Sequence, residues 1–250
     1  MSTAEGGGDI VKNSLLFYVD SANPKSYLGS GLVVNNLVFP ESGELVNGVS
    51  FNTQNKGSFI FDGTDDIINF GDRISSLNLT YPFTIDVWVN VDTTGNTVTT
   101  RGIFATSNTL TITQYYGLAV QLGSFYNGSG NYKVGINVGN GVSAGSTGRR
   151  SYTSDNEVIT GNTWCNIITT LETGPTIRIY INGVEVSGTY SGTGGALVWG
   201  SSKITNIGQP PGGYQYILKG NVSIVRFYNK LFSNSEISQN YNATKSRFGL

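Results

Sequence analysis

The sequence predicts an all-β protein, and three observations support this prediction. Apolar and polar residues alternate with a period of two in several short runs, as they do in strands with one packed face. Gly is abundant, at 34 of 250 residues, and it clusters with Asn, Ser and Thr between those runs, which is typical of turns. Aromatic residues make up 12% of the chain, so the strands carry enough apolar surface to form a core.

The strands are expected along the whole chain. Phe83–Val91 is the clearest, because its odd-numbered residues are all apolar and its even-numbered residues include Thr84 and Asp86. The even-numbered face, which also carries Trp88, is expected to be at least partly solvated. The other strands are expected, in chain order, at 15–20, 103–104, 117–122, 132–138, 164–171, 177–181, 184–186, 204–208 and 220–228.

Two dipeptides ending in Gly predict tight turns. Asp62-Gly63 and Asn182-Gly183 each separate two apolar runs, and Gly tolerates the positive φ that hairpin turns require. Both are therefore expected to form hairpins. The stretches 139–161 and 187–195 are rich in Gly, Ser and Thr and are expected to be loops, with short strands shortening the first.

One short helix is expected near the C-terminus. Ser233 and Glu236 match a capping box, and Ile237 and Tyr241 then share a helix face. The chain shows neither a linker nor an internal repeat. Residues 13–250 are therefore expected to form a single domain, preceded by a flexible, Gly-rich arm at 1–12.

Charge and hydropathy argue against nucleic-acid and membrane partners. The chain has 15 basic and 16 acidic residues, and its longest basic run, Arg149-Arg150, is interpreted as a solvated loop tip. No run approaches the roughly 18 apolar residues of a membrane helix. The first residues do not resemble a signal peptide, so the protein is expected to mature without secretory cleavage or to be carried out of the cell in another way.

The residue types present exclude several kinds of catalysis. His is absent, which removes Ser-His-Asp and Cys-His catalysis and His-ligated metal sites. Cys165 is the only cysteine, so the fold cannot contain an intramolecular disulfide. It lies in an expected strand and is interpreted as a small buried thiol.

Six motifs in order resemble LamG-like members of the concanavalin A-like lectin/glucanase superfamily. They are the turn Phe61-Asp62-Gly63, the strands Phe83–Val89 and Trp164–Thr169, the hairpin Ile179–Val184, Asn206-Ile207-Gly208, and the segment Gly220–Ile237. The resemblance spans residues 13–248 and implies a two-sheet antiparallel jelly-roll sandwich. It also implies binding or structural attachment as the function.

The resemblance gives little support to an enzyme. Glycoside hydrolases of the superfamily carry an E-x-D-x-x-E strand, and retaining hydrolysis needs two carboxyls about 5 Å apart. The corresponding strand here is Phe83–Val91, which holds Asp86 and no Glu. The chain is therefore not expected to be an enzyme, and a degenerate glucanase is the weakest alternative.

Calcium is the one cofactor that the sequence suggests. Asp62, Asp65 and Asp66 bring three carboxylates into one turn, and many LamG-like domains bind calcium at a loop rim. These three residues are candidate calcium ligands. The alternative interpretation is that they cap their own backbone turn.

Glycan binding would need exposed aromatic rings beside polar groups. The candidates are Trp88, Tyr115, Tyr116, Tyr180, Trp199, Tyr214 and Tyr216. Trp199, Tyr214 and Tyr216 are preferred, because they lie near Gly-rich loops. The alternative for each ring is ordinary packing in the sandwich.

The ends of the sequence carry a further resemblance. Residues 15–27 and 241–250 resemble stand-alone LamG-like proteins of tailed bacteriophages. This implies a non-enzymatic virion structural protein, namely a capsid decoration, head fibre or tail-associated subunit at the virion surface. Its expected partners are the major capsid protein or tail subunits, and the host surface polysaccharide to which it would adhere. The alternative is a stand-alone, calcium-dependent carbohydrate-binding module.

Overall fold

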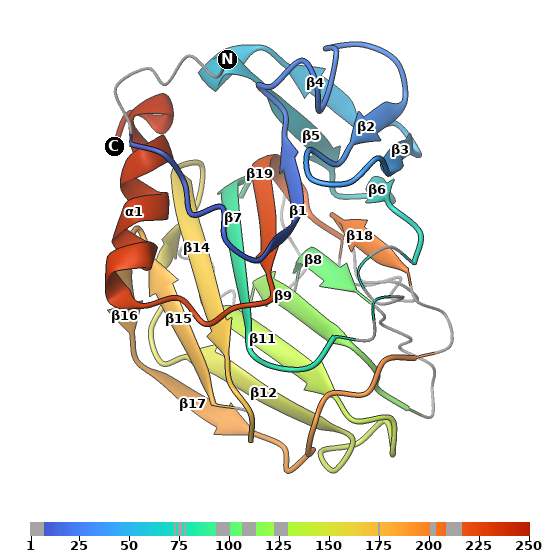
Figure 1. The fold of residues 1–250 in the computed structure, drawn as a ribbon, viewed down its shortest axis with the longest axis vertical. Coiled ribbons are helices and arrows are strands. Elements are labelled where there is room, and N and C mark those ends of the chain that lie inside the picture. Colours follow the sequence, from blue (N-terminus) through green and yellow to red (C-terminus); the bar gives the residue numbers. More distant parts are fainter. Residues whose placement is uncertain are drawn as a thin grey trace.

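The chain folds into two β-sheets that face each other as the layers of a sandwich, with a helix beside one of them (Figure 1). The computed structural model describes residues 8–72, 74, 77, 79–93, 101–106, 114–122, 130–174, 176–200, 204–208 and 217–250. All strand pairs within these residues are antiparallel. The predicted all-β sandwich is confirmed.

Sheet A is built around the long strand β19. In spatial order the sheet contains β16 (Val184–Val186), β15 (Ile177–Ile181), β14 (Trp164–Leu171), β7 (Phe83–Val91), β19 (Lys219–Tyr228), β5 (Ser58–Asp62) and β4 (Ser50–Asn52), with β1 (Leu15–Asp20) also paired to β19. The first part of β19 pairs with β5 and the remainder with β1, while β7 pairs along its other side. The strands β7 and β19 are therefore the centre of this layer.

Sheet B is the opposing layer. In spatial order it contains β17 (Gly188–Ser191), β12 (Arg149–Ser154), β11 (Val134–Gly139), β9 (Leu118–Leu122), β8 (Arg101–Thr106), β18 (Thr205–Ile207), β6 (Ile67–Asn69), β3 (Ser42–Val46) and β2 (Val33–Asn35). A separate pair joins β10 (Asn131–Tyr132) to β13 (Ile159–Thr160), and a short 3-10 turn, η1, spans Gln54–Lys56. The expected loop at 187–195 thus contains an edge strand, β17.

The main hydrophobic core fills the space between the two sheets. Inward residues of both layers meet there, and aromatic rings link them: Phe17 of β1 contacts Phe70 at 4.8 Å between ring centroids, and Phe104 of β8 contacts Phe227 of β19 at 6.4 Å. The period-two pattern of the sequence is sufficient to place these side chains, because alternate residues of a strand point to opposite faces.

The two predicted hairpins have different outcomes. Asn182-Gly183 joins the paired strands β15 and β16, with φ of 51° and 81° at the turn, and this hairpin is confirmed. The prediction for Asp62-Gly63 is wrong, because β5 pairs within sheet A and the following strand β6 pairs within sheet B. The turn carries the chain from one layer to the other. Its Gly63 has φ of 86° and lies against Lys219, which a Cβ would approach to 2.9 Å.

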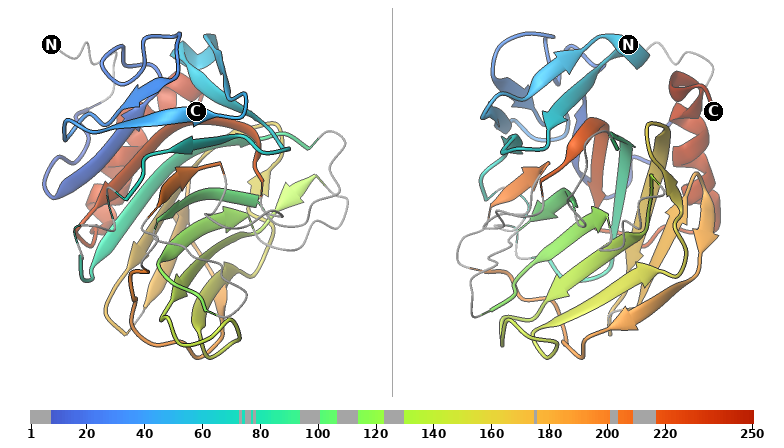
Figure 2. Two further views of the ribbon diagram at one scale, coloured as in Figure 1. Left: turned by 90° about the vertical axis from the view of Figure 1, so that its right-hand side faces the viewer. Right: turned by 180° about the vertical axis from the view of Figure 1, so that it is seen from behind.

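The outer face of sheet A is covered by the end of the chain. Helix α1 (Asn234–Thr244) and the 3-10 helix η3 (Lys245–Phe248) lie along it (Figure 2). The predicted capping box is confirmed: Ser233 Oγ accepts from the Glu236 N–H at 3.4 Å, and Glu236 Oε2 accepts from the Ser233 N–H at 3.0 Å.

This cover overturns the expectation of a solvated face on β7. Thr84, Asp86 and Trp88 are all fully buried. The Trp88 ring stacks on Phe248 at 4.1 Å, and its indole N–H donates to Thr244 Oγ1 at 2.9 Å. The alternation in β7 identified the core face correctly, but the pattern of one strand contains no information about what packs on its second face.

A buried polar network fastens this cover to sheet A. The Arg226 guanidinium of β19 pairs with Asp86 of β7, with 2.8 Å between Nη1 and Oδ2, and both side chains are fully buried. Asn166 Nδ2 donates to the other carboxylate oxygen of Asp86 at 2.7 Å, and Asn240 Nδ2 of α1 donates to Oδ2 at 2.9 Å. Three side chains, from two neighbouring strands and the helix, thus converge on one carboxylate.

The beginning of the described chain joins the same network. The Val11 N–H donates to Asn240 Oδ1 at 2.8 Å, and Gln239 Nε2 of α1 donates to the Asp9 carbonyl at 2.7 Å. Val11 is buried. The expected boundary between arm and domain, at residue 13, therefore lies too late in the chain, because the segment around Val11 already packs on α1.

Replacing Arg226 by Met is expected to lower the free energy of unfolding by about 3–5 kcal/mol, because it leaves the Asp86 carboxylate buried without its counter-charge. Arg178 provides the matched control, since its ion pair with Glu185 is exposed, and Arg178→Met should cost less than about 1 kcal/mol. Urea unfolding of both variants measures the difference. Similar losses in the two variants would contradict the role assigned to the buried pair.

Candidate functional site

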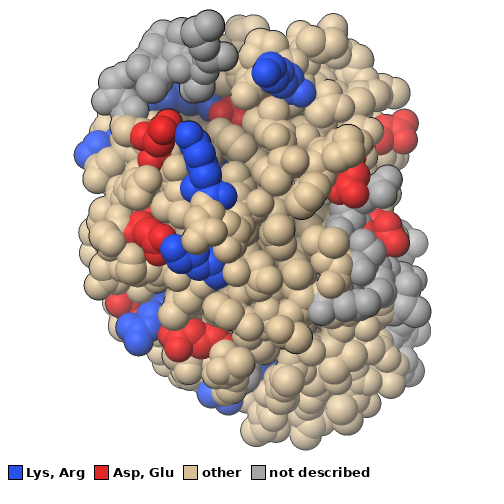
Figure 3. Space-filling view, viewed as in Figure 1, with Lys and Arg blue, Asp and Glu red and all other residues tan. Residues whose placement is uncertain are grey.

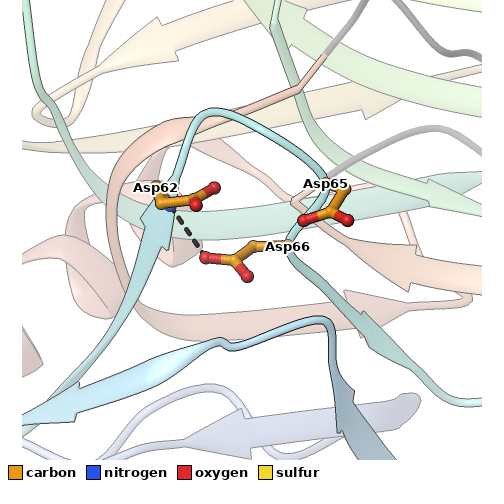
Figure 4. Close-up of side chains that lie close together, drawn as sticks. All are labelled: Asp62, Asp65 and Asp66. Atoms are coloured by element: carbon orange, nitrogen blue, oxygen red, sulfur yellow. Dashed lines mark hydrogen bonds between the residues drawn. The ribbon is translucent and has the colours of Figure 1, made fainter.

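The three predicted acidic residues come together at the turn between the two layers. Asp62 ends β5, and Asp65 and Asp66 lie directly before β6 (Figure 4). Each can bring one carboxylate oxygen within 4.8 Å of the others. Asp62 and Asp65 are exposed, whereas Asp66 is only 2% exposed. The sequence prediction that these carboxylates are neighbours is confirmed.

Part of this cluster is explained by the turn itself. Asp66 Oδ2 accepts from the Asp62 N–H at 2.8 Å, and Asp62 Oδ1 accepts from the Thr64 N–H at 2.7 Å. Asn47 Nδ2 donates to the Asp65 carbonyl at 2.9 Å and ties the turn to the end of β3. Two of the three carboxylates therefore cap backbone N–H groups, as the alternative interpretation expected.

One oxygen atom of the cluster is not explained by the turn. Asp66 Oδ1 is buried and has no hydrogen-bond partner. Burial raises the pKa of Asp66, the Asp62 N–H lowers it, and the negative charges of Asp62 and Asp65 raise it further. An unpaired oxygen beside two more carboxylates fits a calcium ion, which prefers oxygen ligands and would relieve the repulsion between the carboxylates.

The aromatic candidates are less accessible than the sequence suggested. Trp88 lies beneath η3 and is fully buried, so its assignment as a glycan contact is wrong. Tyr180 is also buried, in the small core under α1. Both lie on the outer face of sheet A, which the C-terminal segment covers. Asp86, which shares a face of β7 with Trp88, is polar because it belongs to a buried ion pair, and not because that face is solvated.

Trp199 is half-buried. Its indole N–H donates to the Leu79 carbonyl at 2.9 Å, and its ring packs edge-on against Phe83 at 6.1 Å. This leaves no free donor on the ring for a ligand. Tyr115 and Tyr116 are half-buried beside β11, and Tyr116 donates to Gln114 Oε1 at 2.7 Å. Tyr214 and Tyr216 lie outside the described residues.

The outer face of sheet B carries a row of small polar side chains. Cross-strand partners share a face, so strand pairing alone defines a row that runs through Glu44, Asn69, Asn206, Ala105, Ala119, Asn137, Ser151 and Ser191. Two of its polar atoms, Asn206 Oδ1 and Ser151 Oγ, are buried without hydrogen-bond partners. Hydrogen-bonding capacity is therefore unused on this face.

Residues 62–238, more than half of the chain, match the family described as the concanavalin A-like lectin/glucanases superfamily. The chain belongs to this superfamily. The comparison with curated proteins gave no match.

Several solved structures share the superfamily fold with this chain. Domain 4 of an extracellular GH43 arabinanase from Geobacillus stearothermophilus, solved with arabinotriose, is 15% identical with a TM-score of 0.62, over 92% of this chain and 100% of that one. A Trypanosoma rangeli sialidase solved with sialic acid is 15% identical with a TM-score of 0.63, over 99% of this chain and 36% of the sialidase. The receptor-binding domain of a botulinum neurotoxin C/D mosaic serotype is 14% identical with a TM-score of 0.64, over 91% of this chain and 51% of the neurotoxin chain.

Strand β7 corresponds to the strand that carries the catalytic carboxylates in glycoside hydrolases of the superfamily, but its one carboxylate lies in a buried ion pair. Asp86 of β7 is buried in the ion pair with Arg226, beneath α1. It does not point toward the outer face of sheet B. Among the described residues, no helix is both long enough and apolar enough to cross a membrane.

The arginine pair Arg149-Arg150 was interpreted as a loop tip, and this is wrong. Both residues begin β12, and each guanidinium lies over an aromatic ring: Arg149 at 5.6 Å from the Tyr115 centroid and Arg150 at 4.2 Å from Tyr190. The segment Arg149–Ser154 contains one apolar residue, Tyr152, which packs against the core, so its sequence shows no period-two pattern that predicts the strand.

Cys165 is expected to resist thiol reagents in the folded protein. Its side chain is buried in β14, and burial raises the pKa of the thiol to about 12, so the nucleophilic thiolate is scarce at neutral pH. Labelling with a chromogenic disulfide at pH 8 should be slow in buffer and fast in denaturant. Rapid labelling of the folded protein would contradict this burial.

Proposed function

We propose that this superfamily member is a non-enzymatic, glycan-binding structural subunit on the virion surface of a tailed phage, as a capsid decoration, head fibre or tail-associated protein. Its partners are then the major capsid protein or tail subunits, and host surface polysaccharide. The resemblance of residues 15–27 and 241–250 to phage proteins supports the particle setting. The arabinanase domain solved with arabinotriose supports a saccharide ligand for a domain of this shape and extent.

The outer face of sheet B is the observation that carries the glycan-binding part. Amide and hydroxyl groups such as Asn69, Asn137 and Ser151 can donate to and accept from sugar hydroxyls. Glu44 is the single carboxylate in the row defined above, whereas hydrolysis of a glycosidic bond generally needs two. A face with hydrogen-bonding groups and without a carboxylate pair supports binding without cleavage.

Two measurements test this proposal. The chain should bind members of a glycan array, and incubation with the bound glycans should release no new reducing ends. An antibody against the chain should label the surface of purified phage particles in electron micrographs. Binding to no glycan, together with unlabelled particles, would refute the proposal, and release of reducing ends would favour a glucanase.

A calcium-dependent carbohydrate-binding module is the second candidate, and the unpaired Asp66 Oδ1 favours it. Asp62, Asp65 and Asp66 would hold the ion, which would then stabilise the turn between the layers.

Calcium at 100 times its dissociation constant is expected to stabilise the protein by about 2.7 kcal/mol, because only the folded state assembles the site. Asp66→Asn should abolish this gain, while Glu185→Gln, which changes an exposed acid of β16, should retain it. Thermal unfolding with calcium and with chelator measures the shift. An unchanged wild-type Tm, or an equal shift in Asp66→Asn, would count against a calcium site.

A further inference from the structure

Three polar side chains lie together on the outer faces of β11 and β12. Ile136 and Val138 are buried in the core, so Asn137 between them points outward. Asn137 is directly paired with Ser151 of β12, and Arg149 is the next outward residue of that strand. Directly opposed side chains have Cβ atoms about 5 Å apart, and alternate residues of a strand are roughly 7 Å apart. All three are therefore within reach of one small ligand.

None of the three side chains makes a hydrogen bond or an ion pair with the described residues. Ser151 is 5% exposed, and its Oγ has no hydrogen bond. Arg149 Nε is likewise buried without a partner, and no carboxylate pairs with its guanidinium in the part of the chain that the structure describes. Buried polar groups normally have partners, because an unmade hydrogen bond is unfavourable. The pattern is typical of a site that is completed by a ligand.

Tyr115 lies beside Arg149, at one end of this group of three side chains. Its ring lies 5.6 Å from the Arg149 guanidinium. The main chain of Tyr115 crosses directly over β11 at Gly139, where a Cβ would come within 2.4 Å of the Tyr115 carbonyl carbon. The Tyr115 carbonyl also accepts from the Gly141 N–H at 2.7 Å. The ring is therefore held beside the guanidinium by the close approach that glycine permits.

The surrounding sequence has no negative charge. From Thr93 to Ser154 the chain contains no Asp or Glu, and β8, β9, β11 and β12 all lie within this stretch. The next acid, Asp155, accepts a hydrogen bond from Thr189 at 2.7 Å. The lower right-hand part of the molecule in Figure 3 likewise shows no acidic side chain. This half of sheet B would attract an anionic ligand more readily than a cationic one.

We propose that Arg149, Ser151, Asn137 and Tyr115 bind a carboxylate-bearing sugar, such as a uronic acid residue, within a polysaccharide. The guanidinium pairs with the carboxylate in the bidentate manner that suits its planar fork. Ser151 and Asn137 bond neighbouring sugar hydroxyls, and the Tyr115 ring packs on the apolar face of the sugar. This inference rests on the proposed glycan-binding function and names the class of glycan.

The experiment compares acidic oligosaccharides with their methyl esters by isothermal titration calorimetry. The probes are oligomers of galacturonate, glucuronate, mannuronate and sialate, each with its fully methyl-esterified form, and one sulfated oligosaccharide without carboxylates. At least one acidic probe should bind, and its ester should bind at least about tenfold more weakly. If no acidic probe binds, or if ester or sulfated probes bind equally well, the proposal is overturned.

Variants of the neighbouring arginines locate the site. Arg149→Met should weaken binding of the acidic probe at least about tenfold, and Arg149→Lys should recover it only in part, because Lys keeps the charge but loses the bidentate fork. Arg150→Met is the matched control, because Arg150 lies on the opposite face of β12 over Tyr190, and it should bind like the wild type. Unchanged affinity in Arg149→Met, with Tm values confirming folded protein, would overturn the proposal.

The outcomes also separate this inference from the proposed function. If neutral glycans bind and Arg149→Met does not change their affinity, the proposed glycan-binding function is retained and only the preference for acidic sugars is refuted. If no glycan of any kind binds, both the acidic-sugar site and the proposed glycan-binding function are refuted.

Discussion

The buried ion pair between Asp86 and Arg226 determines which surfaces of the protein are available. It lies on the outer face of sheet A, where Asn166 and Asn240 complete the coordination of the carboxylate. A charged pair in this position is stable only if further groups satisfy its hydrogen bonds, and α1 supplies one of them. Arg247 at the end of the chain adds a second attachment, through Asp20 at 2.6 Å and the Gly57 carbonyl at 2.8 Å. The C-terminal segment is thereby held over the central strands.

The C-terminal segment covers the outer face of sheet A, and the proposed ligand site lies on the other layer, sheet B. The outer face of sheet A holds two of the predicted glycan contacts, Trp88 and Tyr180, but these rings stabilise the cover and are not accessible. The outer face of sheet B holds small amide and hydroxyl side chains, unused hydrogen-bonding atoms and the Arg149–Tyr115 pair. Recognition on such a face depends on hydrogen bonds and charge more than on ring stacking. The acidic turn at Asp66 lies at the junction of the layers, where a bound cation would stabilise the sandwich.

Local patterns in the sequence were sufficient for the sandwich, the Asn182-Gly183 hairpin, the capping box at Ser233 and the gathering of Asp62, Asp65 and Asp66, because each depends on neighbours in the chain. They were insufficient where a segment that is distant in the sequence determines which face is buried or which strands pair. The face of β7 with Trp88 is buried by a helix about 150 residues later, as the hydrogen bond from Trp88 to Thr244 illustrates. The Asp62-Gly63 turn has the residues of a hairpin, yet its flanking strands find partners in different sheets. The pairing of Asn137 with Ser151, and hence the outer row of sheet B, similarly depends on strand register.

The proposed ligands bind on sheet B because the C-terminal segment occupies the outer face of sheet A. The most direct measurement is photo-crosslinking with an acidic oligosaccharide that carries a diazirine, followed by mass-spectrometric mapping of the labelled peptides. A ligand site on sheet B predicts labels within 114–122 and 134–154, which contain Tyr115, Asn137 and Arg149. Labels concentrated in α1, β7 or β19 would contradict it.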